Sequence, residues 1–353
     1  MAARLCAVLC AAAWWQGTAL AQSLTQPPAE PPAQPQAETH RRAPMPSQAP
    51  GTTQRAPVSV AIEPRRLSPS AWYVQGDLGP VSGANQGFNA NAGFVVTREG
   101  VVVFDALGTP PLGEALLARI RAITDAPIRH VIVSHYHADH FYGLAAFKRA
   151  GAQVWAHRAA AQYLASAAPA ARLEERSRSL APWVRTDDPV VAPDRLLDAE
   201  AAFTLGGLRF RVLPAGPAHT AEDLMLYVEE EGVLFAGDLV FAGRVPFVGD
   251  ADTRGWLASL ERVAALSPRV LVGGHGPASR NAAADLALTR DYLALLRREM
   301  GRAVADLVDF DEAFAAADWS RYAALPAFEA AHRRNAYNVY LQMQREALQP
   351  ASR

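Results

Sequence analysis

Apolar and polar residues follow two different periods along the chain. Short apolar runs between glycine or polar residues are typical of strands. They occur at 71–77, 92–97, 100–106, 131–133, 153–156, 203–205, 208–214, 224–228, 232–238 and 269–275. Apolar residues at helical spacing are found at 111–124, 141–149 and 253–266, through the middle segment 158–185, and over most of 281–348. This order predicts sheets with helices packed on their faces.

The first 21 residues have the pattern of a secretory signal peptide. Arg4 supplies a positive charge, an apolar run follows at 5–15, and Ala19-Leu20-Ala21 forms a small-x-small cleavage site. The run is too short for a membrane span. We therefore expect the chain to be periplasmic or secreted after removal of residues 1–21.

Residues 22–58 are rich in proline, glutamine and alanine and lack periodic apolar positions. Such a segment cannot bury enough apolar surface to offset chain entropy, so we predict a disordered linker. The folded part is expected as one domain at 59–280, followed by a helical C-terminal extension at 281–353.

Composition excludes several classes of function. A formal net charge of −1 over 353 residues argues against a nucleic-acid partner, and we expect a small-molecule substrate. Both cysteines, Cys6 and Cys10, lie in the signal segment, so the mature chain has neither a disulfide framework nor a thiol nucleophile. Nothing in the sequence indicates an oligomeric state.

Seven residues of metal-ligand type follow or end the predicted strands. They are His135, His137, Asp139, His140, His219, Asp238 and His275. Neutral imidazole and carboxylate suit zinc, iron or manganese, whereas calcium and magnesium prefer oxygen alone. Five imidazoles and two carboxylates exceed the needs of one tetrahedral ion and fit two ions that share a carboxylate.

The motifs around these residues resemble those of the metallo-β-lactamase superfamily over about residues 70 to 280. The matching stretches are HYHADH at 135–140, GPAHT at 216–220, FAGD at 235–238 and GGHG at 273–276. The resemblance implies an α/β (α+β) fold of the αββα type. In that four-layer sandwich two sheets face each other between layers of helices, and the metal ions lie in loops at one edge.

The resemblance also implies a role for each ligand. His135, His137 and His219 would hold the first metal, and Asp139, His140 and His275 the second. Asp238 would bridge the two ions. In addition, Asp105 ends the run at 100–106 and matches an acidic position that supports the site in the family.

The bridging position distinguishes groups within the superfamily. True β-lactamases of two subclasses have cysteine where this chain has Asp238, and a third usually has serine. An aspartate there resembles the thioesterase type, glyoxalase II, and general hydrolases. The stretches GFNANAGFVV at 87–96 and FAGRVPFVGDAD at 241–252 further resemble secreted zinc hydrolases associated with sulfur oxidation and quinoprotein relay systems.

The expected function is that of a metal-dependent hydrolase with two Zn²⁺ ions per chain, although iron and manganese suit the same donors. A hydroxide held by both ions, its pKa lowered towards about 7, would attack an ester-, thioester- or amide-like carbonyl. Asp139 and Asp238 are the candidate catalytic residues because they hold the ions that carry this hydroxide.

Four further residues are candidates for a substrate pocket. Tyr136 and Tyr142 flank the ligands, and Arg244 and Phe247 lie on the loop after the bridging aspartate. Arginine at that place suits an acidic substrate. The tail helices, including residues 333–346, are candidates to cover the site.

Three other functions stay open. Persulfide dioxygenases resemble the same superfamily but use one iron, held by residues equivalent to His135, His219 and Asp238. A β-lactamase activity is compatible with a bridging hydroxide. A non-catalytic binding protein on the same fold is disfavoured because such proteins typically lose ligands, and all seven are present.

Overall fold

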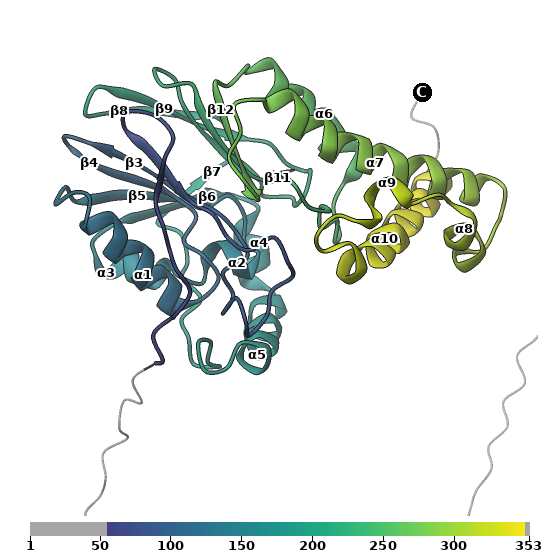
Figure 1. The fold of residues 1–353 in the computed structure, drawn as a ribbon, viewed down its shortest axis with the longest axis horizontal. Coiled ribbons are helices and arrows are strands. Elements are labelled where there is room, and N and C mark those ends of the chain that lie inside the picture. Colours follow the sequence, from purple (N-terminus) through teal and green to yellow (C-terminus); the bar gives the residue numbers. More distant parts are fainter. Residues whose placement is uncertain (1–54, 350–353) are drawn as a thin grey trace, which may run out of the picture. The chain divides into compact units, whose positions relative to one another are not determined.

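The computed structural model describes residues 55–349 (Figure 1). The predicted signal peptide at 1–21, most of the predicted linker at 22–58 and the last four residues of the predicted extension lie outside the described residues. Val58, the last residue assigned to the linker, already packs against the core of the first sheet. Contact with the core therefore begins one residue before the predicted domain.

The first sheet has seven strands in the order of the chain. They are β1 (Arg65–Arg66), β2 (Ala71–Val74), β3 (Ala92–Thr97), β4 (Gly100–Phe104), β5 (Ile128–Ile132), β6 (Gln153–His157) and β7 (Arg195–Leu197). The pairs from β1 to β4 are antiparallel, and those from β4 to β7 are parallel. The switch follows from the connections, because parallel neighbours need a long crossover and a helix or a helical segment follows each of β4, β5 and β6.

The second sheet has five strands in the order β12-β11-β10-β9-β8. They are β8 (Ala201–Leu205), β9 (Leu208–Pro214), β10 (Leu224–Val228), β11 (Val233–Phe241) and β12 (Val270–His275). Only the pair of β11 and β12 is parallel, and the helix α6 connects them. The carboxyl ends of these two strands therefore lie at the same edge of the sheet.

Ten helices are described within residues 55–349 (Figure 1). They are α1 (Pro110–Arg121), α2 (Ala138–Phe141), α3 (Leu144–Arg149), α4 (Ala160–Ala165), α5 (Ala168–Ser179), α6 (Thr253–Ala265), α7 (Ala282–Ala305), α8 (Phe310–Ala316), α9 (Ser320–Ala323) and α10 (Phe328–Leu348). Helix α3 packs on β5 and β6, and α1 packs on α3. Helices α6 and α7 pack on β11, and α10 packs on α7.

Three apolar layers show how the sandwich is built. Along β4, Val101 and Val103 face the helices on one side, while Val102 and Phe104 face the second sheet. This alternation is the two-residue period of a strand whose two faces are both buried. The ring of Phe104 stacks on Phe235 of the opposite sheet with centroids 5.8 Å apart. The predicted αββα fold with C-terminal helices is confirmed.

Several elements differ from those predicted. The strand β1 is missed because its two residues are exposed arginines, and β7 because it has only three residues. The helix predicted at 141–149 is two helices, and the first already begins at Ala138. Asp139 and His140 therefore lie in a helical turn that follows His137. No helix among residues 55–349 has both the length and the apolar character that crossing a bilayer requires.

We predict that the space between the sheets leaves no room for a side chain at Gly93. A Cβ atom there would lie 2.1 Å from Cε1 of Phe235, whose ring is buried. The substitution Gly93→Ala should lower the free energy of unfolding by about 1–3 kcal/mol, the usual cost of overpacking a core. Urea denaturation followed by circular dichroism measures the change.

The matched control is Gly83→Ala, because nothing lies within 4 Å of a Cβ built at that position. We expect its unfolding midpoint to stay close to that of the parent chain. Equal midpoints for Gly93→Ala and Gly83→Ala would show that the two sheets do not pack as closely as described.

Candidate metal centre

Four loops or strand ends bring the seven predicted ligands together. His135 follows β5, and His137 directly precedes α2, which carries Asp139 and His140. His219 lies between β9 and β10. Asp238 lies within β11, and His275 is the last residue of β12. Both sheets therefore contribute to the site, which lies where their strand ends meet.

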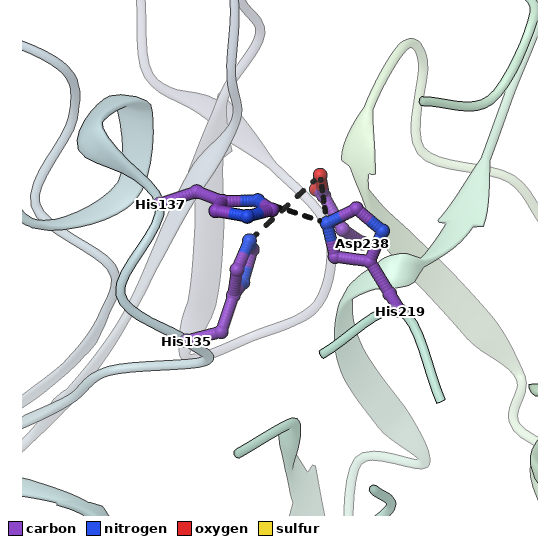
Figure 2. Close-up of side chains that lie close together, drawn as sticks. All are labelled: His135, His137, His219 and Asp238. Carbon is purple, nitrogen blue, oxygen red and sulfur yellow. Dashed lines mark hydrogen bonds and ion pairs between the residues drawn. The ribbon is translucent and has the colours of Figure 1, made fainter. Parts of the chain in front are cut away.

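The first group consists of His135, His137, His219 and Asp238, whose donor atoms all lie within 4.8 Å of one another. Figure 2 shows the three imidazoles and the carboxylate pointing toward one another. Nδ1 of His137 lies 3.0 Å from Nε2 of His219. That nitrogen of His219 is in turn 3.3 Å from Oδ2 of Asp238.

The second group consists of Asp139, His140 and His275, with the same limit of 4.8 Å between donor atoms. Nε2 of His275 lies 3.6 Å from Oδ2 of Asp139. Nε2 of His140 lies 3.9 Å from Oδ1 of the same carboxylate. Two nitrogens and one oxygen thus converge beside the first group.

The carboxylate of Asp238 lies between the two groups. Its Oδ1 is 3.2 Å from Nε2 of His140, while its Oδ2 is 3.4 Å from Nε2 of His275 and 3.3 Å from that of His219. A glycine on β12 permits this position, because a Cβ at Gly274 would lie 1.9 Å from Oδ1 of Asp238. The carboxylate of Asp238 thus lies within reach of nitrogen donors from both groups.

Several donor atoms are buried without a hydrogen bond. Nε2 of His135, Nε2 of His140 and Oδ1 of Asp238 have no hydrogen-bond partner among residues 55–349. A buried polar atom without a partner costs free energy, and native structures avoid it. Bound metal ions would satisfy all three atoms, so the residues present fit a divalent metal centre.

The carboxylate of Asp105 fixes one histidine in each group. Its Oδ2 accepts a hydrogen bond of 2.9 Å from Nδ1 of His140 and one of 2.8 Å from the hydroxyl of Ser134. That hydroxyl lies 3.0 Å from Nδ1 of His135, and because it donates to Asp105 it accepts from the ring. Both rings therefore carry their proton on Nδ1 and present Nε2 to the metal.

A similar hydrogen bond fixes His275 from the loop between β2 and β3. Its Nδ1 donates to the backbone oxygen of Asn89 over 2.6 Å. The side-chain amide of Asn89 donates to Oδ2 of Asp139 over 2.8 Å, so one residue orients two ligands of the second group.

Asn89 and Ser134 were not predicted as site residues from the sequence. The stretch GFNANAGFVV was the available signal for Asn89, and adjacency to His135 was the only one for Ser134.

Burial and neighbouring charges keep three of the rings neutral. Burial lowers the pKa of His135 and His137, and it lowers the pKa of His219 to about 3. Neutral imidazole is the form that binds a metal. Burial alone would raise the pKa of Asp238, but His275 and His140 outweigh it and hold that pKa well below its usual range.

His140 differs from the other three rings. Burial would lower its pKa, but the carboxylates of Asp238, Asp139 and Asp105 outweigh burial and raise the pKa well above its usual value. The ring is thus surrounded by negative charge on three sides. Such a concentration of buried carboxylates is itself a place where a cation is stabilised.

The family model of the metallo-beta-lactamase superfamily matches residues 85–275, a range that contains all seven ligands. The chain belongs to the metallo-beta-lactamase superfamily. Members of this superfamily among its relatives are metal-dependent hydrolases, and the two His/Asp groups of this chain support the use of divalent metal.

Its similarity to individual proteins is low. It is 26% identical over 200 residues to "Metallo-beta-lactamase type 2" of Elizabethkingia meningoseptica, covering 53% of this chain and 69% of the relative. It is 23% identical over 239 residues to "Linear primary-alkylsulfatase" of Pseudomonas sp., covering 58% of this chain and 45% of the relative. Among solved structures, the stereoselective inverting sec-alkylsulfatase Pisa1 from Pseudomonas sp. matches with a TM-score of 0.59 and 19% identity. That match covers 82% of this chain and 52% of the other.

A cavity of about 210 Å³ lies beside the candidate metal-binding residues. His137, Asp139, Asp238 and His275 contribute to its lining. Of the predicted pocket residues, Arg244 and Phe247 line it as well. The metal ligands and the loop after β11 thus both contribute to the lining of the cavity.

Tyr136 and Tyr142 do not line this cavity, contrary to the prediction. The ring of Tyr136 packs against Phe141 with centroids 4.7 Å apart, and its hydroxyl donates to the backbone oxygen of Val191. Tyr142 is buried in the same core, under α2 and α3. Both side chains therefore belong to the apolar core next to the ligand-bearing turn.

The C-terminal helix α10 also contributes to the lining of the cavity. Ala330 and Ala331 line it, and they directly precede the stretch 333–346 that was predicted to cover the site. Asn335 holds the loop that carries Phe247 from both sides. Its amide donates to the backbone oxygen of Pro246 over 2.7 Å, and its Oδ1 accepts from the backbone nitrogen of Val248 over 2.9 Å.

We predict that Asp105→Asn weakens metal binding without moving the backbone. Asp105 has a φ of +62°, which asparagine tolerates well. The two carboxylate oxygens together accept three hydrogen bonds, and in either orientation of the amide its nitrogen cannot accept those of the oxygen that it replaces. Metal affinity should fall about 10- to 100-fold, the usual effect of losing such a support. Competition with a chromogenic chelator measures it.

Ser134→Ala is the matched comparison, because it removes support from His135 and leaves the bond between Asp105 and His140 in place. A smaller loss of affinity is expected for this variant. If Asp105→Asn bound metal as tightly as the parent chain, Asp105 would not be an orienting residue.

Proposed function

We propose that this chain is an exported hydrolase that binds two divalent metal ions, zinc in the first instance. Its substrate would be a small molecule with an ester-, thioester- or amide-like bond. The observation that carries the proposal is the position of Asp238, whose two oxygens lie within 3.4 Å of nitrogens from both groups of donors.

The metal pair, when bound, supplies an activated water and electrophilic assistance to the bond that breaks. The residues of the chain orient the metal ligands and shape the cavity beside them. Asp105 and Asn89 fix the imidazoles of His140 and His275, each through its Nδ1. Phe247, Ala330 and Ala331 form an apolar wall beside the ligands, which limits the entry of bulk water to the reacting groups.

Covalent catalysis by a thiol has no residue to perform it in the folded part. The only cysteines of the sequence are Cys6 and Cys10. An attack by water therefore suits the residues at the site better than a route through a cysteine acyl-enzyme. Sulfate esters are a second candidate substrate class, supported by the similarity to two alkylsulfatases and by a cavity lined in part by arginine.

We predict about two zinc ions per chain when the full chain is produced with export and purified without added metal. Elemental mass spectrometry measures the metal content.

The variant Asp238→Ala should lose metal and turnover, because it removes the oxygens that both groups share. Turnover is measured with panels of 4-nitrophenyl esters, thioesters, sulfate esters and a chromogenic β-lactam.

Asp125→Ala serves as the control, since Asp125 is exposed and belongs to neither group of donors. Full activity of Asp238→Ala would refute the bridging role. One iron per chain with little zinc would instead indicate the mononuclear oxygenase, and no bound metal would indicate a binding protein.

A further inference from the structure

Three arginines surround the cavity beside the metal ligands. Arg172 and Arg176 belong to α5, and Arg244 belongs to the loop after β11. Helix α5 follows a strand of the first sheet and the loop follows a strand of the second, and both line the cavity. None of the three side chains is needed as a metal ligand, because guanidinium has no electron pair to offer at neutral pH.

The spacing on α5 places Arg172 and Arg176 on one face of the helix, four residues apart. Two like charges at this spacing oppose each other, so the arrangement slightly destabilises the isolated helix. Glu175 compensates only in part, at 3.3 Å from Nη1 of Arg172 and 3.6 Å from Nε of Arg176. The Arg176 side chain is 15% exposed, against 70% for Arg178 on the same helix.

Arg244 is buried and its guanidinium is held in position. Nη1 donates to the backbone oxygen of Gly79 over 3.2 Å, and Nε donates to that of Val245 over 3.4 Å. No hydrogen bond from Nη2 of Arg244 is found to the described residues. Burial lowers the pKa of this arginine, but the nearby carboxylates of Asp238 and Asp139 oppose that effect.

The charges of the cavity lining do not balance. Three guanidinium groups line the cavity together with two carboxylates, those of Asp139 and Asp238, while Glu175 offsets part of the charge of Arg172 and Arg176. Both carboxylates are also the oxygens that divalent ions would occupy, and each ion adds positive charge. A cavity of about 210 Å³ with this excess of positive charge favours a small anion in its interior.

We propose that the cavity recognises an anionic group on the substrate, a carboxylate, sulfonate or sulfate, through Arg176 and Arg244, with Arg172 at the entrance. The proposal rests on the hydrolase function proposed above and names the class of its substrate. Arginine suits this role because its planar fork binds such oxyanions through two parallel hydrogen bonds. The small volume limits the part of the substrate that enters to a few carbon atoms beyond the anionic group.

The test compares two substrates that differ in one charge. Mono-4-nitrophenyl glutarate has a free carboxylate, and its methyl ester does not. In the full, zinc-loaded chain, Arg176→Gln should lower kcat/KM for the charged ester about tenfold and leave the neutral ester within about twofold, because a charge-assisted hydrogen bond is lost only with the former. Arg178→Gln is the matched control on the same helix, paired with Glu174 outside the cavity.

Equal losses on both esters, or the same loss in Arg178→Gln, would overturn the proposal. A second measurement separates it from the hydrolase function. Titration calorimetry of glutarate with the parent chain and with Arg176→Gln reports anion binding without turnover. Weaker binding by the variant supports the proposal even if neither ester is hydrolysed, whereas identical binding, or no binding by the parent chain, refutes it.

Discussion

The buried carboxylate of Asp105 is the interaction on which the site depends. It accepts hydrogen bonds from the backbone nitrogen and the hydroxyl of Ser134 and from Nδ1 of His140. Through Ser134 it also fixes His135. One side chain thus sets the orientation of a histidine in each group of donors. Without these hydrogen bonds the imidazole rings could rotate. Their Nε2 atoms would then no longer be held toward the positions where metal ions would bind.

The sandwich places this carboxylate where it is needed. Asp105 directly follows β4, and His135 follows β5, the parallel neighbour of β4. Parallel neighbours end at the same edge of a sheet, so residues 30 positions apart become adjacent. The second sheet repeats the arrangement with β11 and β12, which bring Asp238 and His275 together. Packing between Phe104 and Phe235 then holds the two edges against each other.

The ligands could be predicted from the sequence because each one follows or ends an apolar run. In addition, a cluster of five imidazoles and two carboxylates at strand ends is rarely found outside a metal site. The same reasoning failed for Tyr136 and Tyr142. Adjacency to a ligand along the chain does not determine the face on which a side chain lies, and the turn before α2 directs Tyr136 into the core. Asn89 could not be predicted as an orienting residue, since its backbone oxygen contacts a ring 186 positions away.

The C-terminal helices explain why the cavity is small and selective. Asn335 of α10 clamps the loop at Pro246 and Val248, and the backbone nitrogen of Val245 donates to Pro326. Arg244 directly precedes the first of these bonds and Phe247 lies between the other two, so the C-terminal segment fixes the loop that carries both side chains. A further part of the lining comes from α5, which lies between β6 and β7 of the first sheet in sequence. Because the walls come from elements outside the ligand-bearing strands, they can change without disturbing the metal centre, and the choice of substrate therefore resides in them.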